Sequence, residues 1–164
     1  MPRLTEEQFE VKYQMYKEML YNISYTYLKN SFDSEDLIQE VFLKYLKYDG
    51  NFESLDNEKY WLIRVTINSC KSFLTTAWKK NTILSSEEIE RKKDQGIDTT
   101  YFLAISNLPN KYKEVIVLYY YENFKIEEIA QILKASQSAI KKRLQRAKEK
   151  LKEEIGNDRL WRKN

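Results

Sequence analysis

The sequence predicts an all-α protein of two small helical domains joined by a flexible linker, the second containing a helix-turn-helix. Only three glycines and two prolines occur in 164 residues, so few positions would break a helix. Apolar side chains recur every three or four residues over long stretches, as on the buried side of an amphipathic helix. One polar stretch interrupts these segments. We therefore expect domains at residues 1–80 and 101–164, with residues 81–100 as the linker.

The composition narrows the possible functions. The chain has no histidine and one cysteine, Cys70, which excludes Cys/His zinc sites, His-based catalysis and an intrachain disulfide. It lacks a signal-peptide pattern, and no apolar run approaches the roughly 20 residues that span a bilayer. We therefore expect a cytoplasmic protein with no membrane insertion, cofactor or metal. Residues 1–80 carry 11 basic and 12 acidic side chains, whereas residues 109–164 carry 14 and 8, so the two halves suit different partners.

The first predicted helix covers residues 5–29. Thr5 and Gln8 have the spacing of a capping box, in which each side chain satisfies the other residue's backbone amide. Residues 30–33 break the periodic pattern. The buried side of this helix is predicted to carry Phe9, Tyr13, Tyr16, Leu20, Ile23 and Tyr27.

A second helix is predicted from about Ser34 to Tyr48. Asp36, Gln39 and Glu40 lie at i, i+3 and i+4, so they share one face of this helix. The helix dipole explains an acid near the helix start, but Glu40 lies more than one turn in and needs another reason. The buried side is predicted to carry Ile38, Val41, Phe42, Tyr45 and Leu46.

A third long helix is predicted at residues 56–80, after a loop that begins at Asp49. Arg64, Asn68 and Lys71 recur at i, i+4 and i+7 and form one polar stripe on this helix. Such a stripe, taken without context, is more often solvated than functional. The predicted core anchors are Trp61, Leu62, Val65 and Phe73.

The second half is predicted to contain a helix at residues 110–122 and then a helix-turn-helix at residues 125–152. A short amphipathic helix ends at Lys134, and Ser136 is a suitable N-cap for the helix that follows. A tight turn before a basic second helix is typical of proteins that place that helix in the DNA major groove. The buried stripe of the second helix is predicted to carry Ile140, Leu144, Ala147 and Leu151.

The second helix of this motif is strongly basic. From Lys134 to Lys152 there are eight basic residues and one acid, Glu149. Charge runs often form a solvated surface, but here the positive charges are almost unpaired. Gln137 and Ser138 leave the start of the helix able to approach base edges. These observations favour DNA binding, with phosphate contacts supplied by the excess charge.

The chain resembles a bacterial RNA polymerase sigma factor, most closely the small two-domain extracytoplasmic-function group. The stretch DSEDLIQEVFLK at residues 33–44 resembles the family's core-polymerase-binding helix. WLIRVTINSCKSFL at residues 61–74 resembles its promoter-melting helix. Leu108-Pro109, followed by IEEIAQIL and SQSAIKKRLQRAKEKL, resembles its C-terminal DNA-binding domain. The match covers most of the chain, and the fixed order of these stretches makes it specific.

The resemblance implies roles for the first domain. Asp36, Gln39 and Glu40 would dock on a coiled coil of the polymerase's largest subunit, which supplies the missing reason for Glu40. The loop before the third helix would capture a base flipped from the minus-ten non-template strand. Trp61 matches a family tryptophan and can equally serve as a core anchor. The residues implied to meet the minus-ten strand are Phe52, Trp61, Arg64, Asn68 and Lys71.

The resemblance implies that the second domain binds the minus-thirty-five duplex, with Arg143 on phosphate. The family often has glycine where this chain has Lys134, and a left-handed lysine there would cost roughly 1 kcal/mol. An anti-sigma protein bound between the two domains is a common regulator in this group. The residues expected to meet the minus-thirty-five duplex are Gln137, Ser138, Lys141, Lys142, Arg143, Gln145 and Arg146.

Two other functions fit parts of the sequence. A stand-alone helix-turn-helix regulator would need only residues 109–155, and it leaves the faces that carry Glu40 and Asn68 unexplained. An enzyme acting on nucleic acid through carboxylate-bound magnesium would need an acidic cluster, and none stands out. We therefore expect a sigma factor that is not an enzyme and whose partners are core polymerase and promoter DNA.

Overall fold

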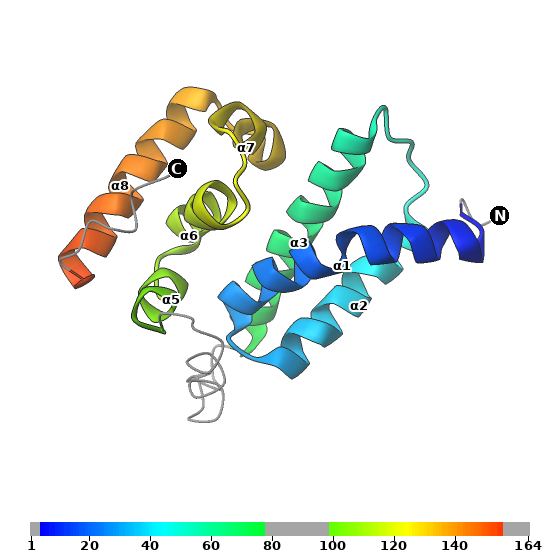
Figure 1. Cartoon of the computed structure of the whole chain (residues 1–164), viewed down its shortest axis with the longest axis horizontal. Helices are drawn as coiled ribbons and strands as arrows, with labels where there is room; N and C mark the ends of the chain where they lie inside the picture. The colour runs from blue at the N-terminus through cyan, green and yellow to red at the C-terminus, as the bar shows by residue number, and fades with distance from the viewer. Residues whose placement is uncertain (1–3, 78–98, 156–164) are drawn as a thin grey trace. The chain divides into compact units, whose positions relative to one another are not determined.

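The computed structural model describes residues 4–77 and 99–155, which form helices and loops with no strand among them. The all-α prediction is confirmed for these residues. The chain divides into two compact units, Met1–Thr82 and Ile83–Asn164. Figure 1 shows helices α1 to α3 in the first unit and α5 to α8 in the second. Most of the predicted linker, residues 81–100, lies outside the described residues.

The first unit is a three-helix cluster of α1(Glu6–Leu28), α2(Ser31–Lys47) and α3(Leu55–Ala77). Each of these helices packs against the other two (Figure 1). The capping box at the start of α1 is confirmed. The Gln8 amide donates to Thr5 Oγ1 at 3.1 Å, and the Thr5 amide donates to Gln8 Oε1 at 3.0 Å.

The second helix begins earlier than predicted. Lys29 adopts a left-handed conformation with φ 59°, and Asn30 is extended with φ −151°. Asn30 Oδ1 accepts a hydrogen bond from the Asp33 amide at 2.9 Å, so α2 starts at Ser31. The predicted four-residue break was wrong because one strained residue and one capping residue complete the turn.

The core of the first unit is built from all three helices. Leu46, predicted to be buried, is 36% exposed because it lies in the last turn of α2 at the edge of the buried stripe. Most of the side chains that fill this core are aliphatic or tyrosine: Leu20, Ile23, Tyr27, Leu28, Val41, Tyr45, Leu62, Ile63 and Ile67.

None of the helices in the described segments is long and apolar enough to cross a membrane.

The second unit contains α5(Thr99–Ser106), α6(Asn110–Ile116), the π-helical turn η2(Val117–Tyr121), α7(Ile126–Leu133) and α8(Gln137–Ile155). Helix α8 packs against α5, α6 and α7. Helix α5 starts two residues before the predicted domain boundary. The predicted buried stripe of α8 is confirmed, and it meets an aliphatic core from the other helices: Ile105, Val115, Ile116, Leu118, Ile129, Ile132, Ile140, Leu144, Ala147 and Leu151.

The helix predicted at residues 110–122 is not α-helical throughout. The Glu122 amide donates to the Val117 carbonyl at 3.0 Å, a spacing of five residues that defines a π turn. The Phe124 amide then donates to the Leu118 carbonyl at 2.9 Å, and Asn123 has φ 58°. This wider turn ends the helix and leaves both Leu118 and Phe124 in the core.

The turn of the helix-turn-helix contains a left-handed lysine. Lys134 ends α7 in the left-handed conformation, with φ 54° and ψ 49°. The predicted cap of α8 is confirmed, because the Ala139 amide donates to Ser136 Oγ at 3.0 Å. Replacing a non-glycine residue at a left-handed position by glycine removes the steric clash of its Cβ.

We therefore expect Lys134→Gly to raise the free energy of unfolding of the second unit by about 1 kcal/mol. Urea denaturation of the full chain, followed by far-UV circular dichroism, measures the change. Lys141→Gly is the matched control, since Lys141 is also exposed but lies inside α8. There glycine should lower the free energy of unfolding by about 1 kcal/mol. The same sign of change for both variants would contradict the strain at Lys134.

Candidate functional site

Helix α2 presents an exposed stripe that mixes acidic, amide and apolar side chains. The predicted docking residues Asp36, Gln39 and Glu40 are all exposed. Phe32 and Leu43 are 77% and 54% exposed and extend the same stripe at four-residue spacing. We call these five residues the α2 face. Exposed apolar side chains beside polar ones are typical of a surface that docks another protein.

Sequence reasoning missed the two apolar members of the α2 face. Phe32 was assigned to the predicted break between helices, and Leu43 was given no role. Leu43 lies inside the predicted helix, four residues after Gln39, so this spacing could have placed it on the face. Phe32 joins the face only because the Asn30 cap starts α2 at Ser31, and periodicity did not reveal that cap.

The α2 face connects to α3 through Lys44. Lys44 Nζ lies 3.4 Å from Glu40 Oε1 and donates to Ser69 Oγ on α3 at 3.1 Å. Both side chains of the ion pair are about half exposed, so the pair contributes only about 0.3–0.5 kcal/mol. Glu40 therefore stays available to a binding partner.

A groove of about 460 Å³ lies between α1 and α2, next to the α2 face. Gln39 belongs to both the groove and the face. Glu18 and Glu35 are the carboxylates in this groove, and nowhere in the described ranges do three or more acidic or cysteine side chains gather to hold a metal ion. The other lining residues are Tyr13, Lys17, Tyr21 and Ile38.

The loop between α2 and α3 holds Phe52 in a group of rings, which we call the aromatic cluster. The Phe52 ring lies 5.2 Å from that of Tyr48, 5.7 Å from Trp61 and 6.3 Å from Tyr45. Tyr45 and Tyr48 are nearly parallel to Phe52, with interplanar angles of 16° and 25°. Trp61 is half-buried in this cluster, so its role as a packing anchor is supported by these contacts.

Gly50 in this loop lies directly against the ring of Tyr48. A Cβ on Gly50 would overlap the ring of Tyr48, which folds back over the loop. Beside the loop is a cavity of about 400 Å³ whose lining includes Asn51, Phe52 and Ser54. An aromatic ring next to short polar side chains suits a base that has left the duplex, because the base offers both a π-face and a hydrogen-bonding edge.

The predicted minus-ten residues of α3 lie on the side of the helix that starts at the aromatic cluster. Trp61, Arg64, Asn68 and Lys71 are spaced by three, four and three residues, which places them along one face. Asn68 is exposed, whereas Arg64 and Lys71 are half-buried. Because Phe52 contacts Trp61, the loop and this face of α3 meet at the aromatic cluster.

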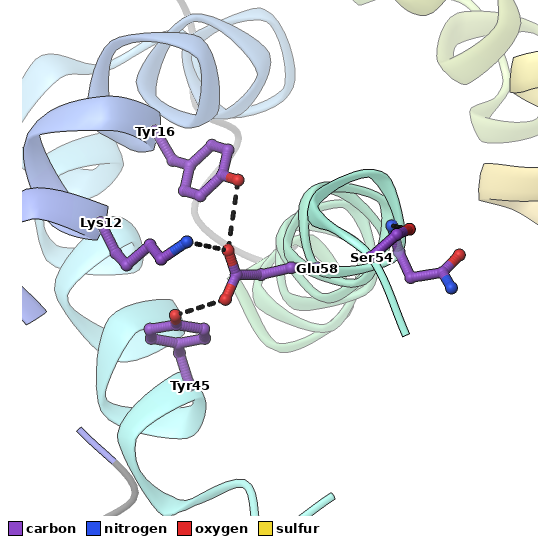
Figure 2. Close-up of polar contacts among 6 residues, drawn as sticks. Lys12, Tyr16, Tyr45, Ser54 and Glu58 are labelled. Carbon is purple, nitrogen blue, oxygen red and sulfur yellow. Dashed lines mark hydrogen bonds and ion pairs between the residues drawn. The ribbon is translucent and has the colours of Figure 1, made fainter. Parts of the chain in front are cut away.

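A buried carboxylate lies behind this surface and was missed by sequence reasoning. Glu58, near the start of α3, is 5% exposed. Figure 2 shows Lys12 and Tyr16 of α1 and Tyr45 of α2 directed at its carboxylate. Lys12 Nζ lies 2.8 Å from Oε1, the Tyr16 hydroxyl donates to Oε1 at 3.3 Å, and the Tyr45 hydroxyl donates to Oε2 at 2.8 Å. In the sequence, an acid in the first turns of a helix is readily explained by the dipole alone.

Tyr16 responds to this environment. Burial, followed by the charge of Glu58, raises the pKa of Tyr16 from 10.0 to about 12. Above pH 10 the unfolded chain loses this proton while the folded protein keeps it, so stability falls as the pH rises toward 12. Below pH 10 the contribution of Tyr16 to stability is complete.

We expect the free energy of unfolding to fall more steeply between pH 10 and 12 in the natural protein than in Tyr16→Phe. Urea denaturation at several pH values measures both slopes. Tyr121→Phe, which removes an exposed phenol from the second unit, should retain the steep slope. Parallel curves for the natural protein and Tyr16→Phe would contradict the raised pKa.

In the second unit, the outer side of α8 carries most of the predicted duplex-binding residues. Arg143 differs from the rest because it is half-buried and its Nη1 lies 3.6 Å from Oε1 of Glu114, a residue of α6 that is 5% exposed. Sequence reasoning did not find this ion pair. The other six predicted residues are all exposed: Gln137, Ser138, Lys141, Lys142, Gln145 and Arg146.

Two more basic residues of α8 lie against rings of their own unit. Lys148 Nζ is 5.7 Å from the ring centroid of Tyr120, and Lys150 Nζ is 5.6 Å from that of Tyr112. Such cation–π contacts are worth about 0.5–1 kcal/mol at exposed sites. The positive charge of α8 therefore divides into an outward set and a set that contacts α6 and η2.

A smaller hollow of about 290 Å³ lies at the start of α8. Gln137 lines it together with Tyr119 of η2 and Lys125 at the start of α7. The Lys125 amide donates to Glu128 Oε1 at 2.8 Å, which supplies half of a capping box for α7. Tyr119 was predicted only to pack within its own domain, and Lys125 was given no individual role. The π turn that positions Tyr119 could not be predicted from periodicity.

Comparison with known families agrees with the division into two units. Residues 13–80 match the family model for sigma-70 region 2, and residues 101–151 match that for sigma-70, region 4. RNA polymerase sigma factor SigV of Bacillus subtilis is 32% identical over 80% of this chain and 81% of its own length. ECF RNA polymerase sigma factor SigW of the same organism is 28% identical over 86% of this chain and 85% of its own.

Two solved structures share the fold at low sequence identity. The sigma factor RpoE from Bartonella quintana, solved in complex with the anti-sigma factor NepR, aligns with a TM-score of 0.67 at 22% identity, covering 92% of this chain and 98% of its own. CnrH, solved in complex with the cytosolic domain of CnrY, aligns with a TM-score of 0.69 at 19% identity, covering 94% and 91%. At these identities the likeness establishes the all-α, two-domain fold.

Proposed function

Because this chain belongs to the extracytoplasmic-function sigma factors of bacterial RNA polymerase, we propose that its α2 face binds core polymerase and that its two units contact separate promoter elements. Sigma factors direct polymerase to promoters, and the catalytic chemistry is the polymerase's. The protein is accordingly proposed to act by recognition and strand separation in the cytoplasm and not as an enzyme.

The observation that carries the proposal is the composition and exposure of the α2 face. Asp36, Gln39 and Glu40 are exposed between two exposed apolar residues, Phe32 and Leu43. Apolar anchors within a polar surround supply most of the binding energy in protein interfaces.

Contact with the minus-ten strand is assigned to the loop before α3 and to the adjoining face of α3. The Phe52 ring and the cavity beside it would receive a flipped base, and Asn68, exposed on the same face, would contact the strand further along. Arg64 and Lys71 add positive charge near the proposed path of the strand.

Contact with the minus-thirty-five duplex is assigned to the outer side of α8. Gln137 and Ser138 lie at its first turn, where a helix in the major groove meets base edges. Lys141, Lys142 and Arg146 would neutralise phosphates or read guanine, and Gln145 lies between them. Arg143 is the exception, because its ion pair with Glu114 engages its guanidinium.

Regulation by an anti-sigma factor is also proposed. One structural neighbour, RpoE of Bartonella quintana, was solved with the anti-sigma factor NepR. A partner that covers the α2 face would compete with polymerase for the same side chains. Competition binding between such a partner and core polymerase would test this point.

Run-off transcription from genomic fragments, with core polymerase and with or without this protein, tests the proposed function. Transcripts that depend on the protein and start at a few sites are expected, and their upstream sequences would define both promoter elements. Specific duplex binding without affinity for core polymerase would contradict the proposal and favour a stand-alone regulator.

We expect Asn68→Ala to impair promoter opening more than formation of the closed complex. The exposed Asn68 amide would act only on the separated strand, so duplex binding through α8 should persist. Permanganate footprinting measures opening, and gel-shift binding at low temperature measures the closed complex. If the variant opens a bubble of normal size at the normal rate, the result would count against the role of Asn68.

A further inference from the structure

We propose that Glu58 is a positioning residue for capture of the minus-ten base and acts through its hydrogen bond with Tyr45. This inference rests on the proposed base capture by the loop between α2 and α3. It adds a residue whose carboxylate is already engaged by Lys12, Tyr16 and Tyr45 and which determines where the capturing ring, Phe52, is held.

The hydrogen bond between Tyr45 and Glu58 lies at the base of the loop between α2 and α3. Helix α2 ends at Lys47 and α3 begins at Leu55, so residues 48–54 form the loop. Tyr45 lies just before the loop and Glu58 just after it, and the Tyr45 hydroxyl donates to Glu58 Oε2 at 2.8 Å. The bond therefore joins the two ends of the loop at its base.

Glu58 is itself held by two side chains of α1 and by the end of the loop. Its Oε1 accepts from Lys12 Nζ at 2.8 Å and from the Tyr16 hydroxyl at 3.3 Å, both on α1 (Figure 2). Its backbone amide donates to the carbonyl of Ser54, the last loop residue, at 3.2 Å. A buried carboxylate with a counter-charge and several donors is held in one orientation, because losing any donor leaves a desolvated charge. Glu58 thus gives Tyr45 a fixed point outside the loop.

Tyr45 connects Glu58 to Phe52, the ring on which the flipped base would stack. The ring of Tyr45 is fully buried and lies nearly parallel to that of Phe52, 6.3 Å away. Tyr48 and Trp61 also contact Phe52, so Phe52 has little freedom to change its angle. Phe52 and Glu58 both line the cavity of about 400 Å³ beside the loop. A shift of Tyr45 would therefore be passed to the ring on which a flipped base would stack.

Tyr45 and Tyr16 offer a matched pair of variants. Each donates one hydroxyl hydrogen bond to the Glu58 carboxylate, but Tyr45 stands at the base of the loop and stacks on Phe52, whereas Tyr16 belongs to α1. Tyr45→Phe and Tyr16→Phe each remove a single oxygen atom and keep the ring. A purely structural role for the Glu58 network predicts similar effects of the two changes on all activities.

The experiment measures base unstacking in the holoenzyme. Promoter fragments identified by run-off transcription would carry 2-aminopurine at each minus-ten position of the non-template strand in turn. Tyr45→Phe is expected to lower the equilibrium constant for base capture by about five- to ten-fold, corresponding to about 1–1.4 kcal/mol. Tyr16→Phe should change it less than two-fold, because Lys12 Nζ, at 2.8 Å, still holds the same carboxylate oxygen of Glu58. Affinity for core polymerase should be unchanged in both variants.

Coupling to Phe52 completes the test. If Glu58 and Tyr45 act through Phe52, Tyr45→Phe should have no further effect in a Phe52→Ala background. Glu58→Gln, which keeps an acceptor oxygen for Tyr45, should retain more base capture than Glu58→Leu, which removes it. If Tyr45→Phe fails to fold, the comparison of Glu58→Gln with Glu58→Leu tests the same positioning role.

Equal losses for Tyr45→Phe and Tyr16→Phe, or additive losses for Tyr45→Phe and Phe52→Ala, would overturn the positioning role. If Phe52→Ala alone leaves base capture unchanged, the proposed function of the loop fails, and this inference fails with it. Equal or additive losses with a normal effect of Phe52→Ala would therefore contradict only the role of Glu58, whereas no effect of Phe52→Ala would contradict base capture by the loop.

Discussion

Replacing Leu43 with lysine is expected to lower the affinity of the protein for core polymerase at least about ten-fold, or about 1.4 kcal/mol. Leu43 is 54% exposed, so the change should cost the folded protein little. Its loss would remove an apolar anchor from the α2 face and place a charge where the partner would have to desolvate it. Fluorescence anisotropy of labelled protein titrated with purified core polymerase measures the affinity.

Val11→Lys is the matched control for this change. Val11 is 57% exposed on α1, on the side of that helix opposite to Tyr13 and Lys17, which line the groove next to α2. It therefore tests the same substitution of an exposed apolar residue outside the α2 face. Binding to minus-thirty-five duplex should be unchanged in both variants. Equal loss of polymerase affinity in both would show that the α2 face is not the docking surface.

The second large effect is expected on duplex binding, where Arg146 and Arg143 should behave differently. Arg146 is exposed on the outer side of α8, and Arg143 pairs with the buried Glu114. Arg146→Gln should weaken binding about ten-fold and reduce the slope of log affinity against log salt by about 1, as for a lost phosphate contact. Arg143→Gln should leave that slope unchanged.

Arg143→Gln should instead destabilise the second unit by about 1–3 kcal/mol, because it removes a counter-charge from a buried carboxylate. Duplex binding at 50 to 200 mM salt and thermal unfolding of the same samples provide both measurements. A reduced salt slope for Arg143→Gln, with unchanged thermal stability, would restore Arg143 to the phosphate contacts predicted from the sequence.

Features set by neighbouring residues could be predicted from the sequence. The capping box of Thr5 and Gln8, the Ser136 cap and the buried stripe of α8 depend on residues within a few positions of one another. The same is true of the shared face of Asp36, Gln39 and Glu40, because helix geometry alone places i, i+3 and i+4 together. The family resemblance rested on short stretches in a fixed order, such as DSEDLIQEVFLK at residues 33–44, and the matches to regions 2 and 4 confirm it.

Predictions failed where a local pattern admitted two outcomes. Residues 30–33 looked like a break, but the Asn30 cap starts α2 at once, and Leu46 fell at the exposed edge of its stripe. The segment after Ile116 continued the helical pattern of apolar residues. Its backbone nevertheless forms a π turn, in which the Glu122 amide donates to the carbonyl five residues earlier, and the helix ends there. Small differences in hydrogen bonding decide such cases, and periodicity does not resolve them.

By itself, the sequence determined most of the helices, the caps at Thr5 and Ser136, the all-α two-domain fold and the residues that share each helix face. Only the tertiary structure decided which residues distant in the sequence contact one another. Glu58 accepts from Tyr16, 42 residues away, and Arg143 of α8 pairs with Glu114 of α6. Such contacts arise because burying a charge requires a partner wherever the fold can supply one, and that choice depends on how helices pack and not on their own spacing.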